Sequence, residues 1–351
     1  MENPAMTGQP LQNHDEEADV PVRHLAAPIP GEGENGVYTQ SWFPLCLSDE
    51  LETGRVISRE FLGGRVLVYR DSEGKAHVMS AYCPHLGADI GVGAVVGDNV
   101  QCPFHHWQFD SAGHCVKTAI GDHPPRTARL FKFPTIERLG LVMAFNGVKP
   151  LFDFPDLFPH DESELNISTF RGAVMDCDGW VFAANTPDMQ HLKVLHGVSF
   201  EHEDPHKLVH WHEWGFHYNF SGGTAEQNQK GEAELAWKLG IHGSNIFFQE
   251  GTHNGRWYGA FTVFGCSRPN KSGIYAGIVT RRSEDDGNAA GLTLLNEMKV
   301  FESHVLNEDL PVLNTIRYRP GTLTKSDKTL ARFLDYLRAY PRAHPSAPFI
   351  H

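Results

Sequence analysis

Two short segments that each pair a cysteine with a histidine constrain this chain more than any other feature of its sequence. Cys83 and His85 form a C-x-H motif, and Cys102 and His105 form a C-x-x-H motif, with sixteen residues between His85 and Cys102. Proline and glycine near these pairs predict short loops with a hairpin between them. Thiolates and imidazoles held in two such loops are typical ligands of transition-metal centres.

The mixture of ligands in this set indicates which centre the loops bind. Zinc ribbons and fingers more often use C-x-x-C pairs or two histidines on one arm. Two cysteines and two histidines divided between two loops are typical of a [2Fe–2S] cluster, in which thiolates bind one iron and imidazoles bind the other. We therefore expect Cys83, His85, Cys102 and His105 to bind such a cluster, and a zinc site is the alternative.

Length, charge and cysteine usage limit the class of protein. A chain of 351 residues is long enough for two domains. A net charge of −13, without a Lys/Arg-rich run, argues against nucleic acid or anionic membranes as partners. We expect no membrane span and no signal peptide, because no apolar run has the required length or position. The six cysteines show no disulfide framework, which predicts a cytoplasmic protein.

The residue pattern divides the chain into four segments. Residues 1–36 are polar and rich in proline and glycine, which predicts a disordered or extended arm. A G-x-G-x-x-G match at 31–36 has no strand before it and therefore predicts no nucleotide site. Residues 37–150 are expected to form an all-β domain, and residues 151–340 an α+β domain with helices over an antiparallel sheet, the helix-grip arrangement. Residues 341–351 form a C-terminal tail.

Individual elements follow from periodicity and from capping residues. Residues 65–70 and 76–80 are predicted to form a hairpin that leads into the first cysteine loop. A helix is expected to be capped by Thr186 and to begin at Pro187, and a final helix to be capped by Ser326. The remaining predicted elements are strands at 139–145, 206–218, 246–248, 257–264 and 274–280, and helices at 290–315 and 326–340.

A second candidate metal site lies in the predicted helix after Pro187. Asp188, His191 and His196 form a D-x-x-H-x4-H motif, and Gly197 follows it. Residues five apart on a regular helix point about 140° away from each other, so both imidazoles can reach one metal only if the helix bulges or ends between them. Gly197 predicts that it ends there. Two histidines and one carboxylate with open coordination positions are the ligands of non-haem Fe(II) oxygenases.

The third ligand of this site is expected on the long helix at 290–315. Asp309 falls within the apolar stripe of that helix, and a buried acid is costly unless it is paired or bound to a metal. Glu302 lies seven residues earlier, shares the same face, and is the alternative ligand.

The pairing of these two motifs resembles the catalytic (alpha) subunits of Rieske non-haem iron oxygenases, over residues 37–340. The resemblance favours Asp309 as the third ligand, and it assigns Asp188 a catalytic role: bridging the iron-bound His191 to a cluster histidine, here His105. Within the family, the two loops are most similar to monooxygenases of the ketosteroid-hydroxylase and aminopyrrolnitrin-oxygenase type.

The resemblance implies an oxidoreductase that oxidises a small, mostly apolar cyclic substrate at a mononuclear Fe(II), with dioxygen and electrons from a separate ferredoxin or flavin reductase. The outcome could be hydroxylation, demethylation, N-oxidation or desaturation. The resemblance also implies a head-to-tail homotrimer, in which one subunit's cluster lies beside the next subunit's iron. The alternatives are the alpha subunit of a ring-hydroxylating dioxygenase and an electron-transfer Rieske protein without oxygenase activity.

Three positions depart from the pattern of the family. Leu86 stands where many relatives carry arginine, and His106 stands where many carry glycine. Ala184 replaces an asparagine that many members place four residues before the bridging aspartate. None of these departures removes an expected ligand.

Overall fold

The computed structural model describes residues 27–200, 202–224, 235–253, 255–283 and 287–351. The arm predicted for residues 1–36 therefore lies mostly outside the described residues. Its described end, residues 27–36, packs against the body of the protein, where Ile29 joins a buried apolar cluster. None of the helices in the described ranges is long and apolar enough to cross a membrane.

Short antiparallel strands build the N-terminal domain, as the sequence predicts. They form three sheets, with strand orders β3-β4-β5, β6-β7-β8-β9 and β10-β11-β2. The predicted hairpin is present as β4 and β5, and the predicted closing strand as β11. The strands are β2 (Trp42–Leu47), β3 (Val56–Phe61), β4 (Gly64–Arg70), β5 (Ala76–Ser80), β6 (Ala94–Val96), β7 (Asn99–Gln101), β8 (Gln108–Phe109), β9 (Cys115–Lys117), β10 (Thr135–Arg138) and β11 (Leu141–Phe145).

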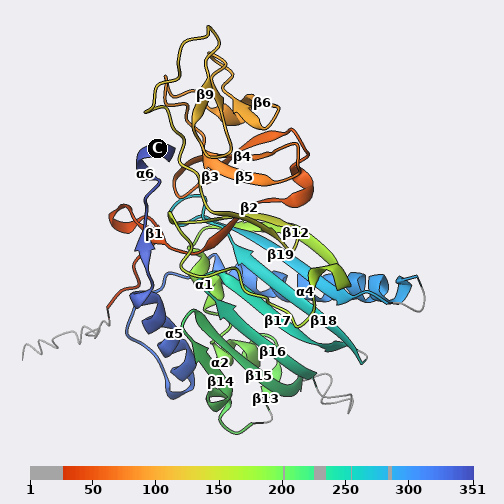
Figure 1. Cartoon of the computed structure of the whole chain (residues 1–351). Helices are drawn as coiled ribbons and strands as arrows, with labels where there is room; N and C mark the ends of the chain where they lie inside the picture. Colours follow the sequence, from red (N-terminus) through yellow and green to blue (C-terminus); the bar gives the residue numbers. More distant parts are fainter. Residues whose placement is uncertain (1–26, 201, 225–234, 254, 284–286) are drawn as a thin grey trace, which may run out of the picture.

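One long antiparallel sheet forms the C-terminal domain, in the order β12-β19-β18-β17-β16-β15-β13, with β14 paired to β15. In Figure 1 this sheet extends below the small N-terminal sheets, which lie at the top of the molecule. Its strands are β12 (Leu165–Met175), β13 (Val198–Phe200), β14 (Val209–His212), β15 (Gly215–Thr224), β16 (Leu235–His242), β17 (Ile246–His253), β18 (Arg256–Phe264) and β19 (Ser272–Arg281).

Helices cover this sheet, which confirms the expected α+β architecture. Helix α4 (Ala289–Leu313) packs on β12, β18 and β19, and its first half is held there by a cluster that includes Tyr258, Leu294 and Met298. Helix α5 (Lys328–Ala339) buries Phe333, Leu334 and Leu337 against the rest of the domain. The short helices are α1 (Gly179–Ala183), α2 (Met189–Val194) and α6 (Ala347–Ile350).

Three predicted elements are wrong in detail. Helix α2 begins at Met189, because the Asp188 carboxylate caps it by accepting from two backbone N–H groups. Helix α5 begins at Lys328 after a 3-10 turn, because Thr324 and Asp327 cap that turn reciprocally. The strand predicted at 206–218 is instead the hairpin of β14 and β15, with Gly215 at a φ of 134° opposite His212.

The two domains share a buried core and are also joined by the chain ends. Phe152, Phe154 and Phe158 of the connecting segment pack between β2 and β11 of the first domain and β17 and β18 of the second. Strand β20 (Arg342–Ala343) pairs with β1 (Tyr38–Thr39), and α6 then buries Ile350 in the N-terminal core. Thus, the segment predicted as a C-terminal tail is part of the packing of the first domain.

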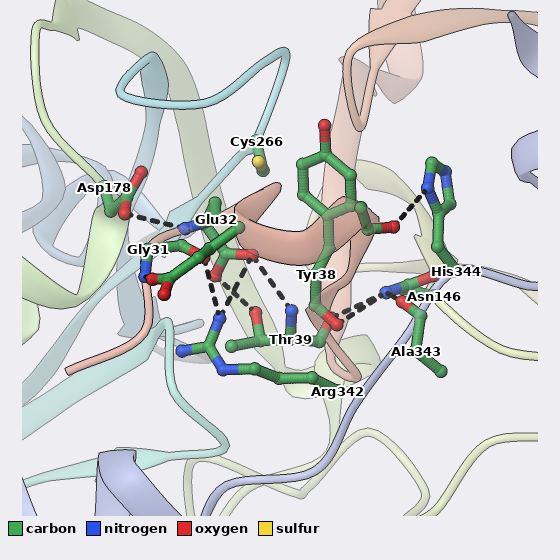
Figure 2. Close-up of polar contacts among 12 residues, drawn as sticks. Gly31, Glu32, Tyr38, Thr39, Asn146, Asp178, Cys266, Arg342, Ala343 and His344 are labelled. Atoms are coloured by element: carbon green, nitrogen blue, oxygen red, sulfur yellow. Dashed lines mark hydrogen bonds and ion pairs between the residues drawn. The ribbon is translucent and has the colours of Figure 1, made fainter.

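A buried polar network secures this return (Figure 2). The Glu32 carboxylate accepts from the backbone N–H of Thr39 at 2.9 Å and from its hydroxyl at 2.7 Å, and it lies 3.9 Å from the Arg342 guanidinium. The backbone N–H of Glu32 donates to Asp178 at 2.9 Å. Asn146, completely buried, donates to backbone carbonyls of both β1 and β20. These contacts join residues 32–39 to residues 342–343, about three hundred positions later in the chain. Buried hydrogen bonds therefore hold the C-terminal segment against the N-terminal domain.

Candidate metal centres

The first two predicted ligand pairs lie in loops of the N-terminal domain. One loop follows β5, and there the Cys83 backbone N–H donates to Ala88 O at 2.9 Å. The other follows β7, and there the Cys102 N–H donates to Trp107 O at 2.9 Å. Both cysteines are buried beneath the loops. Burial raises the pKa of the Cys83 thiol to about 12, so a metal would have to displace the proton to bind the thiolate.

The two histidines of these loops lie nearer the surface than the cysteines. The rings of His85 and His105 meet edge to face, with centroids 4.7 Å apart. The Trp107 ring stacks on His85 with a centroid distance of 4.6 Å and an interplanar angle of 10°, which fixes the orientation of that imidazole. Thiolates inside and imidazoles outside would place one iron in the domain and the other at its surface.

The spread of these four residues argues against a single zinc ion. A tetrahedral zinc with bonds of about 2.0–2.3 Å brings its ligand atoms within about 4 Å of one another. Among the described residues, only one group of three or more histidines, cysteines or acids has all its ligand atoms within 4.8 Å, and it does not include Cys83, His85, Cys102 or His105. Two irons, each with its own ligand pair, fit the observed arrangement.

The loops also show the setting of the two unusual residues. Leu86 is 67% exposed beside His85. His106 adopts a φ of 53°, in the left-handed region that glycine occupies without cost. The preference of the resembled family for glycine at this position thus has a steric reason, and this chain tolerates an exposed histidine there.

The compact group found in the described part of the chain consists of His191, His196 and Asp309. The Nε2 atoms of the two histidines are 3.0 Å apart, and Asp309 Oδ1 lies 3.4 Å from the first and 3.2 Å from the second. Helix α2 ends at Val194, so His196 is free of the helical rotation, as the sequence predicts. Gly197, with a φ of 64°, then turns the chain into β13.

The hydrogen bonds of the two imidazoles show that this group fits a metal cation. His191 Nδ1 faces the backbone carbonyls of Asn185 and Asp188 at 3.1 and 3.2 Å, and His196 Nδ1 faces a Glu308 oxygen at 3.0 Å. Because all these partners are acceptors, each Nδ1 carries the hydrogen and each Nε2 presents a lone pair. Asp309 Oδ1 is buried and has no hydrogen-bond partner in the described part of the chain.

Protonation equilibria indicate the same need for positive charge. Burial opposes ionisation of Asp309, but the adjacent imidazoles of His191 and His196 outweigh it when they carry a proton, and they lower the pKa of Asp309 to about 2. For His196, burial by itself would lower the pKa of the imidazole. The neighbouring carboxylates of Asp309 and Glu308 outweigh this effect, so the pKa of His196 is raised. In the absence of metal a proton on the imidazoles would balance the carboxylate, and a divalent cation would replace it.

Two acidic residues near this group, Asp188 and Glu302, make other contacts and do not belong to the compact group. The Asp188 carboxylate accepts from the backbone N–H groups of Gln190 and His191 at 3.0 and 3.1 Å, so within one chain it caps α2. Glu302, the alternative third ligand, is not part of the compact group. Its carboxyl instead accepts hydrogen bonds from the side chains of Gln249 and Tyr258.

Sequence reasoning gave no role to Glu308, which orients His196. It approaches His196 through Oε2, and its other oxygen lies 3.5 Å from His304 one turn earlier. Its position directly before Asp309 and four residues after His304 was the only available signal.

A cavity of about 680 Å³ opens beside the His191–His196–Asp309 group. Its walls come from α2, from strands β16–β19 and from α4. Most of the lining is apolar or aromatic, including Phe170, Trp237, Phe247, Phe261 and Phe301. A metal at the wall of an apolar cavity can act on an apolar molecule held against it.

Comparison with known proteins identifies the N-terminal domain. Residues 41–133 match the family model of the Rieske [2Fe-2S] domain. In sequence, the chain is 30% identical over 190 residues to cholesterol 7-desaturase nvd of Bombyx mori, covering 50% of this chain and 41% of the relative. It is 33% identical over 129 residues to the oxygenase component of 3-ketosteroid-9-alpha-monooxygenase of Rhodococcus rhodochrous, covering 36% and 32%. These matches span less than half of each relative.

Comparison with solved structures extends the fold to the C-terminal domain. NdmA of Pseudomonas putida CBB5, solved with caffeine, matches with a TM-score of 0.66 at 20% identity, covering 85% of this chain and 89% of that one. Dicamba monooxygenase, solved with dicamba, matches with a TM-score of 0.59 at 19% identity, covering 86% and 97%.

The chain therefore contains a Rieske [2Fe-2S] domain, joined to a helix-over-sheet domain like that of these monooxygenase structures. More particularly, up to half of the chain is similar in sequence to the cholesterol 7-desaturase and the 3-ketosteroid-9-alpha-monooxygenase oxygenase component named above. The resemblance, fold class and cluster expected from the sequence are thereby confirmed.

Proposed function

We propose that this chain is the oxygenase component of a Rieske non-haem iron monooxygenase. A single observation carries the proposal: two imidazole Nε2 atoms and one carboxylate oxygen converge at the wall of an apolar cavity, in a chain that also has a Rieske domain. Residues 37–150 would receive electrons, and residues 151–340 would use them.

Each set of ligands has a defined part in this proposal. Cys83 and Cys102 would bind the inner iron of the cluster, and His85 and His105 the outer one, where electrons enter and leave. His191, His196 and Asp309 would hold a mononuclear Fe(II), which supplies the redox chemistry that activates dioxygen. The chain's own residues orient this site: Glu308 fixes His196, and the Asn185 carbonyl fixes His191.

The lining of the cavity supports a proposal for the class of substrate. Its aromatic and aliphatic lining suits a mostly apolar cyclic molecule. Relatives named for cholesterol and for a 3-ketosteroid lead us to propose a multi-ring substrate. Hydroxylation, demethylation, N-oxidation and desaturation all remain available to such a site.

The arrangement of the two centres leads us to propose a head-to-tail homotrimer. In Figure 1 the strands β6 and β9, at the end of the N-terminal domain that carries the cluster loops, lie at the opposite end of the molecule from α2. An electron would therefore pass between subunits, with Asp188 linking His191 to the neighbour's His105. A separate ferredoxin or flavin reductase would supply the electrons, since no nucleotide-binding motif is expected. Free cysteines at all six positions agree with a cytoplasmic location.

Iron content and oxygen uptake test this function. The purified chain should hold about three irons, two in the cluster and one at the triad. With a surrogate reductase it should consume dioxygen in a substrate-dependent way. About two irons and no uptake would instead identify an electron carrier, and a co-purifying second subunit would identify a dioxygenase alpha subunit.

A further inference from the structure

A carboxylic acid within the cavity has no part in holding the metal. Glu302, Val305, Leu306 and Asp309 line the cavity from α4, at the spacing of one helix face. Seven residues separate Glu302 from Asp309, which corresponds to about 10 Å along the helix axis. Glu302 therefore lies about two helical turns before Asp309, on the part of α4 that lines the cavity.

The inner end of the cavity is closed by packed apolar side chains. Tyr258, Leu295 and Met298 pack where the first half of α4 meets the sheet, and Phe301 packs against them. Glu302 follows Phe301 directly and still lines the cavity. Glu302 thus follows a residue that packs against this apolar cluster, and its own side chain lines the open volume.

The contacts of the Glu302 carboxyl leave one oxygen for a ligand. Gln249 Nε2 and the Tyr258 hydroxyl both donate to Oε1, the latter at 3.5 Å. Both of these hydrogen bonds end on Oε1, and no described residue forms a hydrogen bond or ion pair with Oε2. The described lining of the cavity also contains no lysine or arginine that could neutralise a carboxylate.

The protonation state follows from this setting. Burial raises the pKa of Glu302 to about 7, although the hydrogen bonds from Gln249 and Tyr258 and the charge of His196 lower it. Because Oε1 accepts from two donors, the proton of the neutral acid belongs on Oε2. The neutral acid therefore presents an O–H donor to a mostly apolar volume.

We propose that Glu302 anchors the substrate by donating a hydrogen bond from Oε2 to an uncharged oxygen, a ketone or hydroxyl, at the end of a multi-ring apolar molecule. This proposal rests on the proposed function, whose substrate class it makes specific. The two helical turns between Glu302 and Asp309 correspond to about 10 Å along the helix axis, which is longer than one six-membered ring. The anchor would thereby select which ring carbon faces the metal.

Matched steroid probes test this anchor by binding alone. We would compare 5α-androstan-3-one, the same skeleton without oxygen (5α-androstane) and 3-amino-5α-androstane, by quenching of tryptophan fluorescence. The wild-type chain should bind the ketone about tenfold more tightly than the hydrocarbon, since one hydrogen bond contributes about that factor. Glu302→Leu should reduce this preference to less than about twofold, and Glu302→Gln, which keeps a donor, should retain most of it.

Several results would overturn the proposal. One is a wild-type chain that does not discriminate ketone from hydrocarbon, and another is a Glu302→Leu chain that discriminates as well as the wild type. Tightest binding of the amine, abolished in both variants, would assign Glu302 a cation-binding role instead. Iron content keeps this test separate from the oxygenase function: Glu302→Leu should retain about three irons per chain, whereas failure of the oxygenase proposal appears as about two irons in the wild type.

Discussion

The Nε2 atom of His196 lies 3.2 Å from Oδ1 of Asp309, and neither atom has a hydrogen on the line between them when His196 is protonated at Nδ1. His196 follows a six-residue helix, and Asp309 lies near the end of a twenty-five-residue helix. Two lone pairs directed at each other in a buried site are stabilised only by a shared cation or proton.

Replacing Asp309 with alanine should remove the mononuclear iron and spare the cluster. Iron per chain should fall from about three to about two, because two imidazoles alone bind Fe(II) weakly. The visible spectrum of the cluster should be unchanged, and oxygen uptake should be lost. Asn307→Ala, an exposed neighbour on α4, is the matched control. If Asp309→Ala retains about three irons per chain and Glu302→Gln loses one, Glu302 is the third ligand instead.

Replacing Glu308 with glutamine should weaken iron binding without abolishing it. Glu308 accepts the hydrogen bond that orients His196, and loss of such an outer partner typically reduces metal affinity about 10- to 100-fold. Titration of the iron-depleted chain with Fe(II) measures this. His304→Ala is the control, because His304 is largely exposed and contacts only the far oxygen of Glu308. If Glu308→Gln and the wild type bind Fe(II) with equal affinity, Glu308 does not contribute to metal binding.

Two substitutions at Asp188 should separate its local and its proposed intersubunit roles. Asparagine can still cap α2, whereas alanine cannot and should lower the free energy of unfolding by about 1 kcal/mol. Both variants should keep cluster and iron yet stall turnover, if Asp188 links His191 to the neighbour's cluster. Iron content, urea unfolding and the rate of cluster reoxidation give the three readouts. Loss of the mononuclear iron in Asp188→Asn would make Asp188 a ligand.

The stability of the wild type relative to Glu302→Gln should fall as pH rises. The pKa of Glu302 is about 7 in the folded chain, above its ordinary value of 4.5, so the folded state holds this proton more tightly than the unfolded state. The resulting stability is complete below pH 4.5 and is lost as pH rises through 7, by about 2–3 kcal/mol between pH 5 and pH 8. Urea unfolding at both values measures it. A constant difference between the two chains would show that Glu302 ionises freely.

Motifs of closely spaced residues were predictable from the sequence. Cys83, His85, Cys102 and His105 could be assigned because their types and spacing already define the donor set. The end of α2 before His196 was predictable from Gly197. The first residues of the helices were less predictable. Thr186 and Ser326 are good N-cap residues in isolation, and only the folded chain shows that Asp188 and Asp327 are the N-cap residues of α2 and α5.

Residues far apart in the chain required the tertiary structure. By itself the sequence determined a Rieske domain and an α+β second domain, and it predicted a pair of candidate imidazole ligands, because ligand type, spacing and hydrophobic period are local properties. The tertiary structure decided that Asp309 joins the imidazoles, that Glu308 orients His196, and that Glu302 lines the same cavity as this group. All three depend on how α4 packs across the sheet beside α2, and that packing is set by burial of apolar surface over the whole domain.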